Sequence, residues 1–224
     1  MSAWVALEGV NGVGKSHLGR LAAGVLGERC VPLVELPDSE PAGLPGQVIA
    51  ALHSAGDRFL RTGHPRTETL LLAALQVHRW EALPAPGAGQ VVLEDRGPAS
   101  VAAYQAAVLA ESSDATDAWA LEQALAIGRA IGAWRPPPTA TVLVTDDPAL
   151  CLARFERRTG RPCSADERAL MARAGRLYHL LAHDRPDRYA LLDRRAVGER
   201  EAVEFIADVC RTAAAGALRE GTTP

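Results

Sequence analysis

The chain has 224 residues, a formal net charge of −3 and a hydrophobic fraction of 48%. This length allows one α/β domain or two small ones with a substantial core, and the negative charge argues against nucleic acid or an anionic membrane as the main partner. No apolar run approaches the length of a membrane span, and no basic-then-apolar leader precedes the first predicted strand. The cysteines lack C-x-x-C spacing, so we expect free thiols and a cytoplasmic location.

Short apolar runs alternate with longer segments of helical periodicity along the chain. In chain order, this pattern predicts strand 3–7, helix 15–26, strand 30–36, helices 47–54 and 67–83, strand 90–94, helices 99–111 and 114–131, strand 140–144, a helix from residue 147, helix 166–183, strand 189–192 and helix 199–215. At least one helix separates each strand from the next, which requires parallel pairing through crossovers.

The predicted fold is α/β, with an open parallel five-stranded sheet of the P-loop NTPase type and helices on both faces. We find no internal repeat and no linker long enough to divide domains, so residues 1–224 are predicted to form one domain. The Arg-rich segment at about 154–166 is predicted to be a short lid. Residues 216–224 are predicted to be a frayed tail.

The most informative stretch, residues 8–16, reads E-G-V-N-G-V-G-K-S and matches the P-loop pattern G-x-x-x-x-G-K-[ST]. Glycines let such a loop curl so that backbone N–H groups point at phosphates, and the helix that follows adds its dipole. Lys15 is expected to reach the terminal phosphates of ATP, and Ser16 to offer its hydroxyl to Mg²⁺. The predicted donor-binding residues are Gly9, Asn11, Gly12, Gly14, Lys15, Ser16 and His17.

Further polar residues follow the other predicted strands, whose carboxyl ends meet at one edge of a parallel sheet. Asp95 can orient water around Mg²⁺, and Arg96 can hold a second phosphate bidentately. The alternative for this pair is a salt-bridged strand terminus. Glu40, in the loop after the second strand, is a candidate base or ligand partner, with an ordinary loop carboxylate as the alternative.

Four arginines gather in the sequence R-F-E-R-R-T-G-R, at positions 154, 157, 158 and 161. Four guanidinium groups so close together repel one another unless an anion lies nearby. We therefore predict a lid that brings positive charge to a transferring phosphoryl group. The alternative is a solvated helix face supported by Glu156 and nearby acids, and one or two of the four are expected to be structural in either case.

The chain resembles the thymidylate kinase family, within the P-loop nucleoside and nucleoside-monophosphate kinases. Its matching stretches occur in family order over nearly the whole chain. The most specific is D-R-x-x-x-S-x-x-A-Y-Q, formed by Asp95, Arg96, Ser100, Tyr104 and Gln105. The matching stretches begin at Glu8, Glu40, Leu70, Val91, Asp147 and Leu177.

The resemblance implies an ATP- and Mg²⁺-dependent phosphoryl transfer to a nucleotide and a homodimer, with no nucleic-acid or membrane partner. It assigns catalytic roles to Lys15, Asp95, Arg96, Arg157, Arg158 and Arg161. Ser16 and Asp95 are the implied metal ligands. The acceptor-binding candidates are Asn11, Glu40, Gln76, Arg79, Arg96, Ser100, Tyr104 and Gln105. For Tyr104 and Gln105 the alternative is core packing and a helix hydrogen bond.

Several positions depart from the family pattern while the phosphate-handling ones remain. Where this chain has Asn11, the family usually has an Asp that binds the acceptor sugar. The family's Arg that reads thymine corresponds to Leu75 or Gln76 in this chain. At the other departures, Ser39 replaces the Arg of the family's R-E-P motif, and Ala50 replaces an Arg in the helix that follows. Gly97 replaces a Tyr or His, and His17 replaces a hydroxyl residue. We therefore expect an acceptor pocket altered from plain thymidine monophosphate, in which Gln76 reads another base edge or Arg79 replaces the missing Arg.

Three functions remain open from the sequence. The leading one is a thymidylate-kinase-like nucleoside-monophosphate kinase, favoured by Arg96 and the lid arginines. The second is a deoxynucleoside kinase in which Glu40 is the general base on the 5′-hydroxyl. The third is a nucleotide-binding module without turnover, which the intact Lys15, Ser16 and Asp95 argue against.

Overall fold

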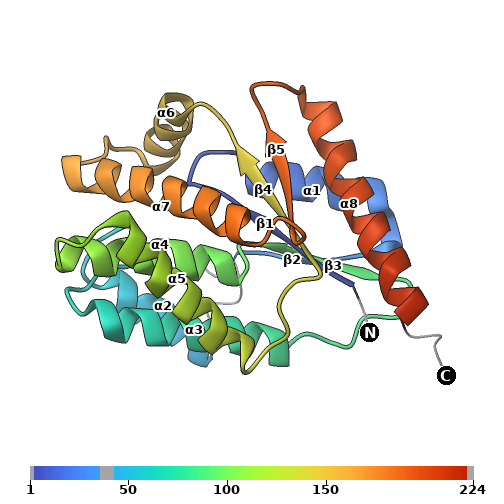
Figure 1. Cartoon of the computed structure of the whole chain (residues 1–224), viewed down its shortest axis with the longest axis horizontal. Coiled ribbons are helices and arrows are strands. Elements are labelled where there is room, and N and C mark those ends of the chain that lie inside the picture. Colours follow the sequence, from blue (N-terminus) through green and yellow to red (C-terminus); the bar gives the residue numbers. More distant parts are fainter. Residues whose placement is uncertain (1–2, 36–42, 221–224) are drawn as a thin grey trace.

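The computed structural model describes residues 3–35 and 43–220, with side chains up to residue 216. Five strands form one sheet in the order β2-β3-β1-β4-β5, and every neighbouring pair is parallel (Figure 1). The predicted fold class is therefore confirmed. The strands are β1 (Ala3–Glu8), β2 (Cys30–Leu33), β3 (Val91–Asp95), β4 (Ala140–Thr145) and β5 (Tyr189–Asp193).

Helices cover both faces of this sheet (Figure 1). An apolar core lies on each side of it. Helices α1 (Lys15–Leu26) and α8 (Glu199–Glu220) pack on one face. The other side is built from α3 (Pro65–Glu81), α4 (Pro98–Ser112), α5 (Asp117–Gly132) and α7 (Ala165–Asp184). The remaining helices are α2 (Leu44–His53), α6 (Pro148–Thr159) and the 3-10 helix η1 (Gly27–Arg29).

The central position of β1 explains why its sequence is apolar from Ala3 to Leu7 and why a functional loop follows it. All six of its residues are buried. It pairs with β3 through Leu7 and Asp95 and with β4 through Glu8 and Leu143. The carboxyl ends of these three strands thus lie together, as predicted, and the loop after Glu8 stands between those that follow β3 and β4.

Several boundaries differ from the predicted ones for local reasons. Strand β2 ends at Leu33, not Leu36, where Leu33 pairs with Glu94, one residue before β3 itself ends at Asp95. Helix α5 begins at Asp117, not at 114, since the Thr116 side chain caps it by accepting from the Trp119 N–H. Helix α8 continues to Glu220, so part of the predicted tail is helical.

The predicted lid is the junction of two helices. Helix α6 continues to Thr159 because the buried Phe155 anchors its last turn on the core. Helix α7 begins at Ala165 with a capping box formed by Ser164 and Glu167. Only residues 160–164 lie outside the helices, and Arg58 donates to the carbonyls of Arg161 and Pro162 in this turn.

The four cysteines are buried free thiols, as predicted. Across residues 3–35 and 43–220, no helix combines the length and apolar character needed to cross a membrane.

Candidate active site

The P-loop leaves β1 at Glu8 and enters α1 at Lys15, and its glycines are required by close backbone contacts. A Cβ on Gly9 would lie 2.3 Å from the carbonyl oxygen of Val144, and one on Gly12 would lie 2.0 Å from that of Cys151. The loop therefore packs directly on β4 and α6. Gly14 caps α1 in the left-handed region, with φ 101°.

Lys15, the only lysine of the sequence, lies inside this loop. Its amine donates to the carbonyls of Gly9 (2.8 Å) and Val10 (3.0 Å). Burial, reinforced by the positive charge of Arg96, lowers the pKa of Lys15 to about 7. The amine is thus held at the loop by neutral carbonyl groups, and an anionic ligand would add the charge that stabilises its protonated form.

We expect the affinity for MgATP to fall as the pH rises from 7 to 9, by up to about tenfold per unit. The pKa of Lys15 is about 7 without ligand, and phosphate raises it, so binding above pH 7 requires proton uptake. Isothermal titration calorimetry in two buffers of different ionisation enthalpy measures that proton directly. The Lys15→Ala variant is the control, because without the amine it should take up no proton. A wild-type affinity for MgATP that does not change with pH, with no proton uptake, would contradict the prediction.

Asp95 and Ser16 supply the oxygen groups that Mg²⁺ prefers. The Oδ1 atom of Asp95 is buried and has no hydrogen-bond partner among the described residues, and Ser16 lies in the first turn of α1. Because Mg²⁺ is commonly held by one or two carboxylates together with nucleotide phosphates, this donor set fits the ion. Ser16 and Asp95 are the residues that would hold it.

A second buried carboxylate, Glu8, stands directly before the P-loop. Burial raises its pKa to about 7, although the hydrogen bond from Ser100 opposes the shift. A Cβ on Gly97 would lie 3.2 Å from Glu8 Oε1 and 2.9 Å from the Cβ of Ala6. The glycine at position 97 is thus explained by packing, because a larger side chain would collide with these groups.

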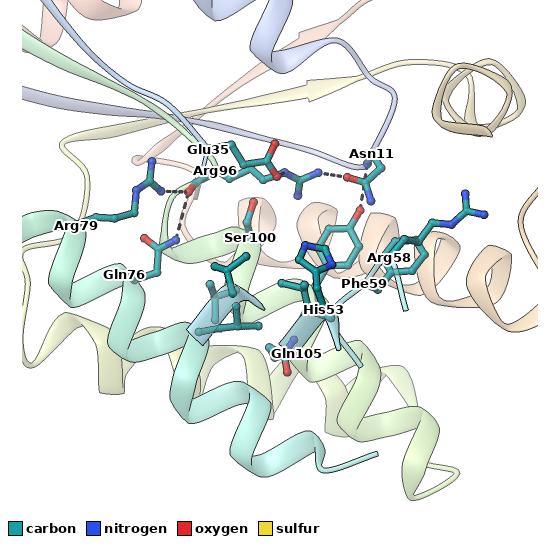
Figure 2. A pocket seen from close by; sticks show the side chains of 15 residues that line it. Asn11, Glu35, His53, Arg58, Phe59, Gln76, Arg79, Arg96, Ser100 and Gln105 are labelled. Carbon is teal, nitrogen blue, oxygen red and sulfur yellow. Dashed lines mark hydrogen bonds and ion pairs between the residues drawn. The ribbon is translucent and has the colours of Figure 1, made fainter. Parts of the chain in front are cut away.

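A pocket opens beside the P-loop, between the end of β2 and helices α2, α3 and α4 (Figure 2). Arg96 crosses one side of it, with its backbone in the left-handed region at φ 60°. Its guanidinium donates to Asn11 Oδ1, lies 5.5 Å from the centre of the Tyr104 ring, and approaches Glu35 with 2.5 Å between Nε and Oε1. The Tyr104 hydroxyl accepts from the Asn11 N–H at 3.1 Å.

This pocket gathers most of the acceptor-binding residues that were predicted from the sequence. The predicted residues in its lining are Asn11, Gln76, Arg79, Arg96, Ser100, Tyr104 and Gln105. Glu40 and Ser39 lie outside the described residues, and Ala50 is exposed on α2. The charged and aromatic lining residues that sequence reasoning missed are Glu35, His53, Arg58 and Phe59, and the aliphatic ones are Ile49, Leu60, Leu72 and Val101.

Gln76 and Arg79 are already engaged with the protein in this structure. The Gln76 amide accepts from Arg135 (3.1 Å) and donates to the carbonyl of Arg96 (3.3 Å). Arg79 pairs with Glu94 at 3.2 Å and donates to the carbonyls of Arg96 and Val34. Both side chains therefore hold the ends of β2 and β3 in place while they line the pocket, and the base recognition expected of them stays a prediction.

The lid arginines differ in their surroundings. Arg154 pairs with Asp146 at 2.7 Å, and Arg161 pairs with Glu167 at 2.8 Å. Arg158 lies over the Phe155 ring at 5.5 Å, and Arg157 is exposed near the end of α6. Two of the four are thus held by neighbouring carboxylates, and Arg157 and Arg158 have no carboxylate within 4.0 Å among the described residues.

His17 and Arg194 lie on the other side of the P-loop. His17 contacts Glu199 at 2.8 Å, so its ring faces the start of α8. Arg194, in the turn after β5, places Nη1 3.8 Å from the Cβ position of Gly14. Its Nε is buried without a hydrogen-bond partner, and it forms no ion pair with a described residue. The sequence offered no signal for Arg194, since only the fold brings β5 to the P-loop.

We expect Arg194→Ala to raise the KM for ATP about five- to tenfold, because it removes a partly buried positive charge beside the P-loop. Steady-state kinetics with varied ATP checks this. Arg195→Ala is a matched control, since Arg195 is exposed and pairs with Asp193 at 2.7 Å. Equal KM values for the two variants would contradict a role of Arg194 in donor binding.

The comparisons with known proteins place this geometry in a known fold. No protein-family model and no curated protein matches the sequence. The crystal structure of thymidylate kinase from Ehrlichia chaffeensis aligns over 93% of this chain and 97% of that chain, with a TM-score of 0.63 and 17% sequence identity. The chain has a thymidylate kinase fold. The resemblance predicted from the motifs is thus confirmed at the level of the fold, and the thymidylate kinase fold here carries the P-loop, Asp95 and Arg96 at adjacent strand ends.

Proposed function

We propose that this protein is an ATP- and Mg²⁺-dependent kinase that transfers the terminal phosphoryl group to a nucleoside-type acceptor. One observation carries the proposal: the P-loop, which holds the buried Lys15, stands beside the pocket that Asn11 and Arg96 line (Figure 2). A donor-phosphate cradle and an acceptor pocket side by side are what in-line transfer needs. The thymidylate kinase fold supports this class of reaction.

Each residue has a role in positioning or in charge. Lys15 and the loop N–H groups would hold the donor phosphates, and Ser16 and Asp95 would hold Mg²⁺, which neutralises charge on the transferring group when bound. Arg157, Arg158 and Arg161 are the proposed lid arginines, and an inward movement of Arg161 would require release of Glu167. No covalent enzyme nucleophile is needed, because positioning and electrostatic stabilisation account for most of such catalysis.

The first candidate acceptor is a nucleoside monophosphate, so that the reaction would be dTMP + ATP to dTDP + ADP or a close relative. Arg96 favours it, since a guanidinium is suited to hold an acceptor phosphate. The second candidate is a free nucleoside, favoured by the carboxylate of Glu35 at the same place. Glu40, the base predicted from the sequence, lies outside the described residues. A homodimer stays a prediction from the resemblance.

The test is coupled ADP release from MgATP with a panel of deoxynucleosides and their monophosphates, with Lys15→Ala as the inactive control. We expect Mg²⁺-dependent turnover with at least one member of the panel. ATP binding with no turnover on any acceptor would contradict the proposal and favour a nucleotide-binding module.

A further inference from the structure

A second cavity lies between helices α6 and α7, next to the carboxyl end of β4 (Figure 1). Its volume of about 510 Å³ falls within the range of about 300–1,000 Å³ that is typical of small-molecule sites. Among the described residues, it shares no lining residue with the acceptor pocket, and Lys15, Asp95 and Arg96 do not line it. It is therefore a space of its own beside the candidate active site.

The walls of this cavity are mostly apolar, because small and aliphatic side chains of two helices line it from either side. The residues of α6 and α7 that form these walls are Pro148, Ala149, Leu152, Met171, Ala172 and Gly175. On each helix they are spaced three and four positions apart, so they share one face. Gly175 keeps α7 clear of the P-loop, since a Cβ there would lie 3.4 Å from Cγ1 of Val10.

The charged side chains of the lining favour an anion. Arg168 forms no ion pair with a described residue, and His179 adds a second basic group on the same helix. Arg176, between them, already pairs with a carboxylate. The acid of the lining, Asp146, is paired with Arg154 at 2.7 Å. Helix α7 rises roughly 16 Å from position 168 to position 179, so the cavity can take an elongated apolar body with an acidic group at its edge.

This cavity shares a wall with the P-loop. Gly9 and Val10 line it, and their carbonyl oxygens are the ones that accept from the Lys15 amine, at 2.8 and 3.0 Å. On the side of α6, Cys151 lines the cavity, and its carbonyl oxygen packs against Gly12. A ligand in the cavity would therefore touch the backbone that places the phosphate-binding amine.

The cavity is also connected to the acceptor pocket through a buried hydrogen bond. Tyr178 lines the cavity, Ser100 lines the acceptor pocket, and their hydroxyl oxygens lie 2.8 Å apart. Both contact Glu8, directly before the P-loop: Ser100 donates to its carboxylate, and the Tyr178 hydroxyl lies 3.4 Å from Oε2. The P-loop thus stands between two cavities and is in contact with each.

We propose that the cavity between α6 and α7 is a second ligand site, which binds a small amphipathic anion and alters the affinity for the donor nucleotide. The ligand is an apolar molecule with one acidic group. The apolar walls take its body, and Arg168 and His179 take its acidic group. Because both ligands contact the P-loop, linkage requires each to change the affinity for the other by the same factor.

Isothermal titration calorimetry with decanoate tests this site, and decyltrimethylammonium is the cation of equal chain length. We expect decanoate to bind with a Kd of about 10–100 µM, at least about tenfold more tightly than the cation. Saturating MgATP should change the Kd for decanoate at least about threefold, and saturating decanoate should change the Kd for MgATP by the same factor. No acceptor is present, so the result does not depend on turnover.

Ala172→Phe adds an aromatic ring to the wall of the cavity and should weaken the binding of decanoate at least about tenfold. Ala169→Phe is the matched control, because Ala169 is exposed on the same helix and does not line the cavity. Thermal unfolding of both variants reports folding.

Three results would overturn the inference. Absence of decanoate binding, or equal binding of the anion and the cation, removes the site. Mutually exclusive binding of decanoate and MgATP would place the anion in the donor site instead. Decanoate binding that leaves the Kd for MgATP unchanged refutes the coupling. In each case the proposed kinase function stands, since ADP release with an acceptor tests it separately.

Discussion

Replacing Lys15 with alanine is expected to reduce MgATP-dependent phosphoryl transfer by about 10³-fold and to leave the fold intact. Loss of a single preorganised charge or donor at the reacting group costs about 10²–10³-fold in comparable sites, and here ground-state binding of the donor phosphates is lost as well. Folding should not suffer, because Lys15 is a buried cation whose lowered pKa shows that the fold disfavours its charge.

The measurement for Lys15→Ala is coupled ADP release together with a thermal unfolding curve. Arg20→Ala is a matched control, since Arg20 is an exposed cation on the same helix α1. Activity within tenfold of the wild type would show that the reacting phosphates do not lie in the P-loop. A large fall in Tm would instead assign Lys15 a structural role.

The second large effect concerns stability, and we expect Arg135→Leu to lower the free energy of unfolding by about 3–5 kcal/mol. Arg135 is fully buried and directs two nitrogens at the Glu94 carboxylate, at 3.1 and 3.0 Å. Its guanidinium stacks on Trp4 at 4.6 Å and faces Trp80 at 5.9 Å. Removing it leaves a completely buried carboxylate with much weaker compensation.

Urea unfolding measures this loss, with Arg185→Leu as the control. Arg185 pairs with Asp184 at 3.8 Å on the surface, where such pairs contribute about 0–1 kcal/mol. The double variant Arg135→Leu with Glu94→Gln should recover part of the loss, because it removes the uncompensated charge. A loss below about 1 kcal/mol in Arg135→Leu would mean that Arg79 and Trp4 alone suffice for Glu94.

The sheet, the P-loop and the Asp95–Arg96 pair were predictable because their signals are local. A buried central strand is apolar along its length, and a phosphate-binding loop needs glycines at fixed spacing. The end of β2 was not predictable in the same way. Its sequence keeps alternating apolar residues beyond Leu33, with Val34 and Leu36 around Glu35, whereas its partner β3 ends at Asp95 and the chain bends at Arg96.

The contacts that decide the chemistry of the pocket were invisible in the sequence. Glu35 was expected within a strand, and Arg135 within a stiff connector before β4. Their partners, Arg96 and Glu94, lie far away along the chain and come close only after the sheet has formed. Gln76 was recognised as a pocket residue, but its bonds to Arg135 and Arg96 depend on that same assembly.

The single lysine gives this enzyme candidate an unusual chemical property. A side-chain amine is nucleophilic only when deprotonated, and the pKa of Lys15 near 7 leaves much of it in that form at neutral pH. Because the other basic side chains are arginines and histidines, an amine-reactive reagent has one side-chain target in the chain, besides the N-terminal amine. That target is the residue that would meet the donor phosphates, so covalent labelling and nucleotide occupancy exclude each other at a single atom.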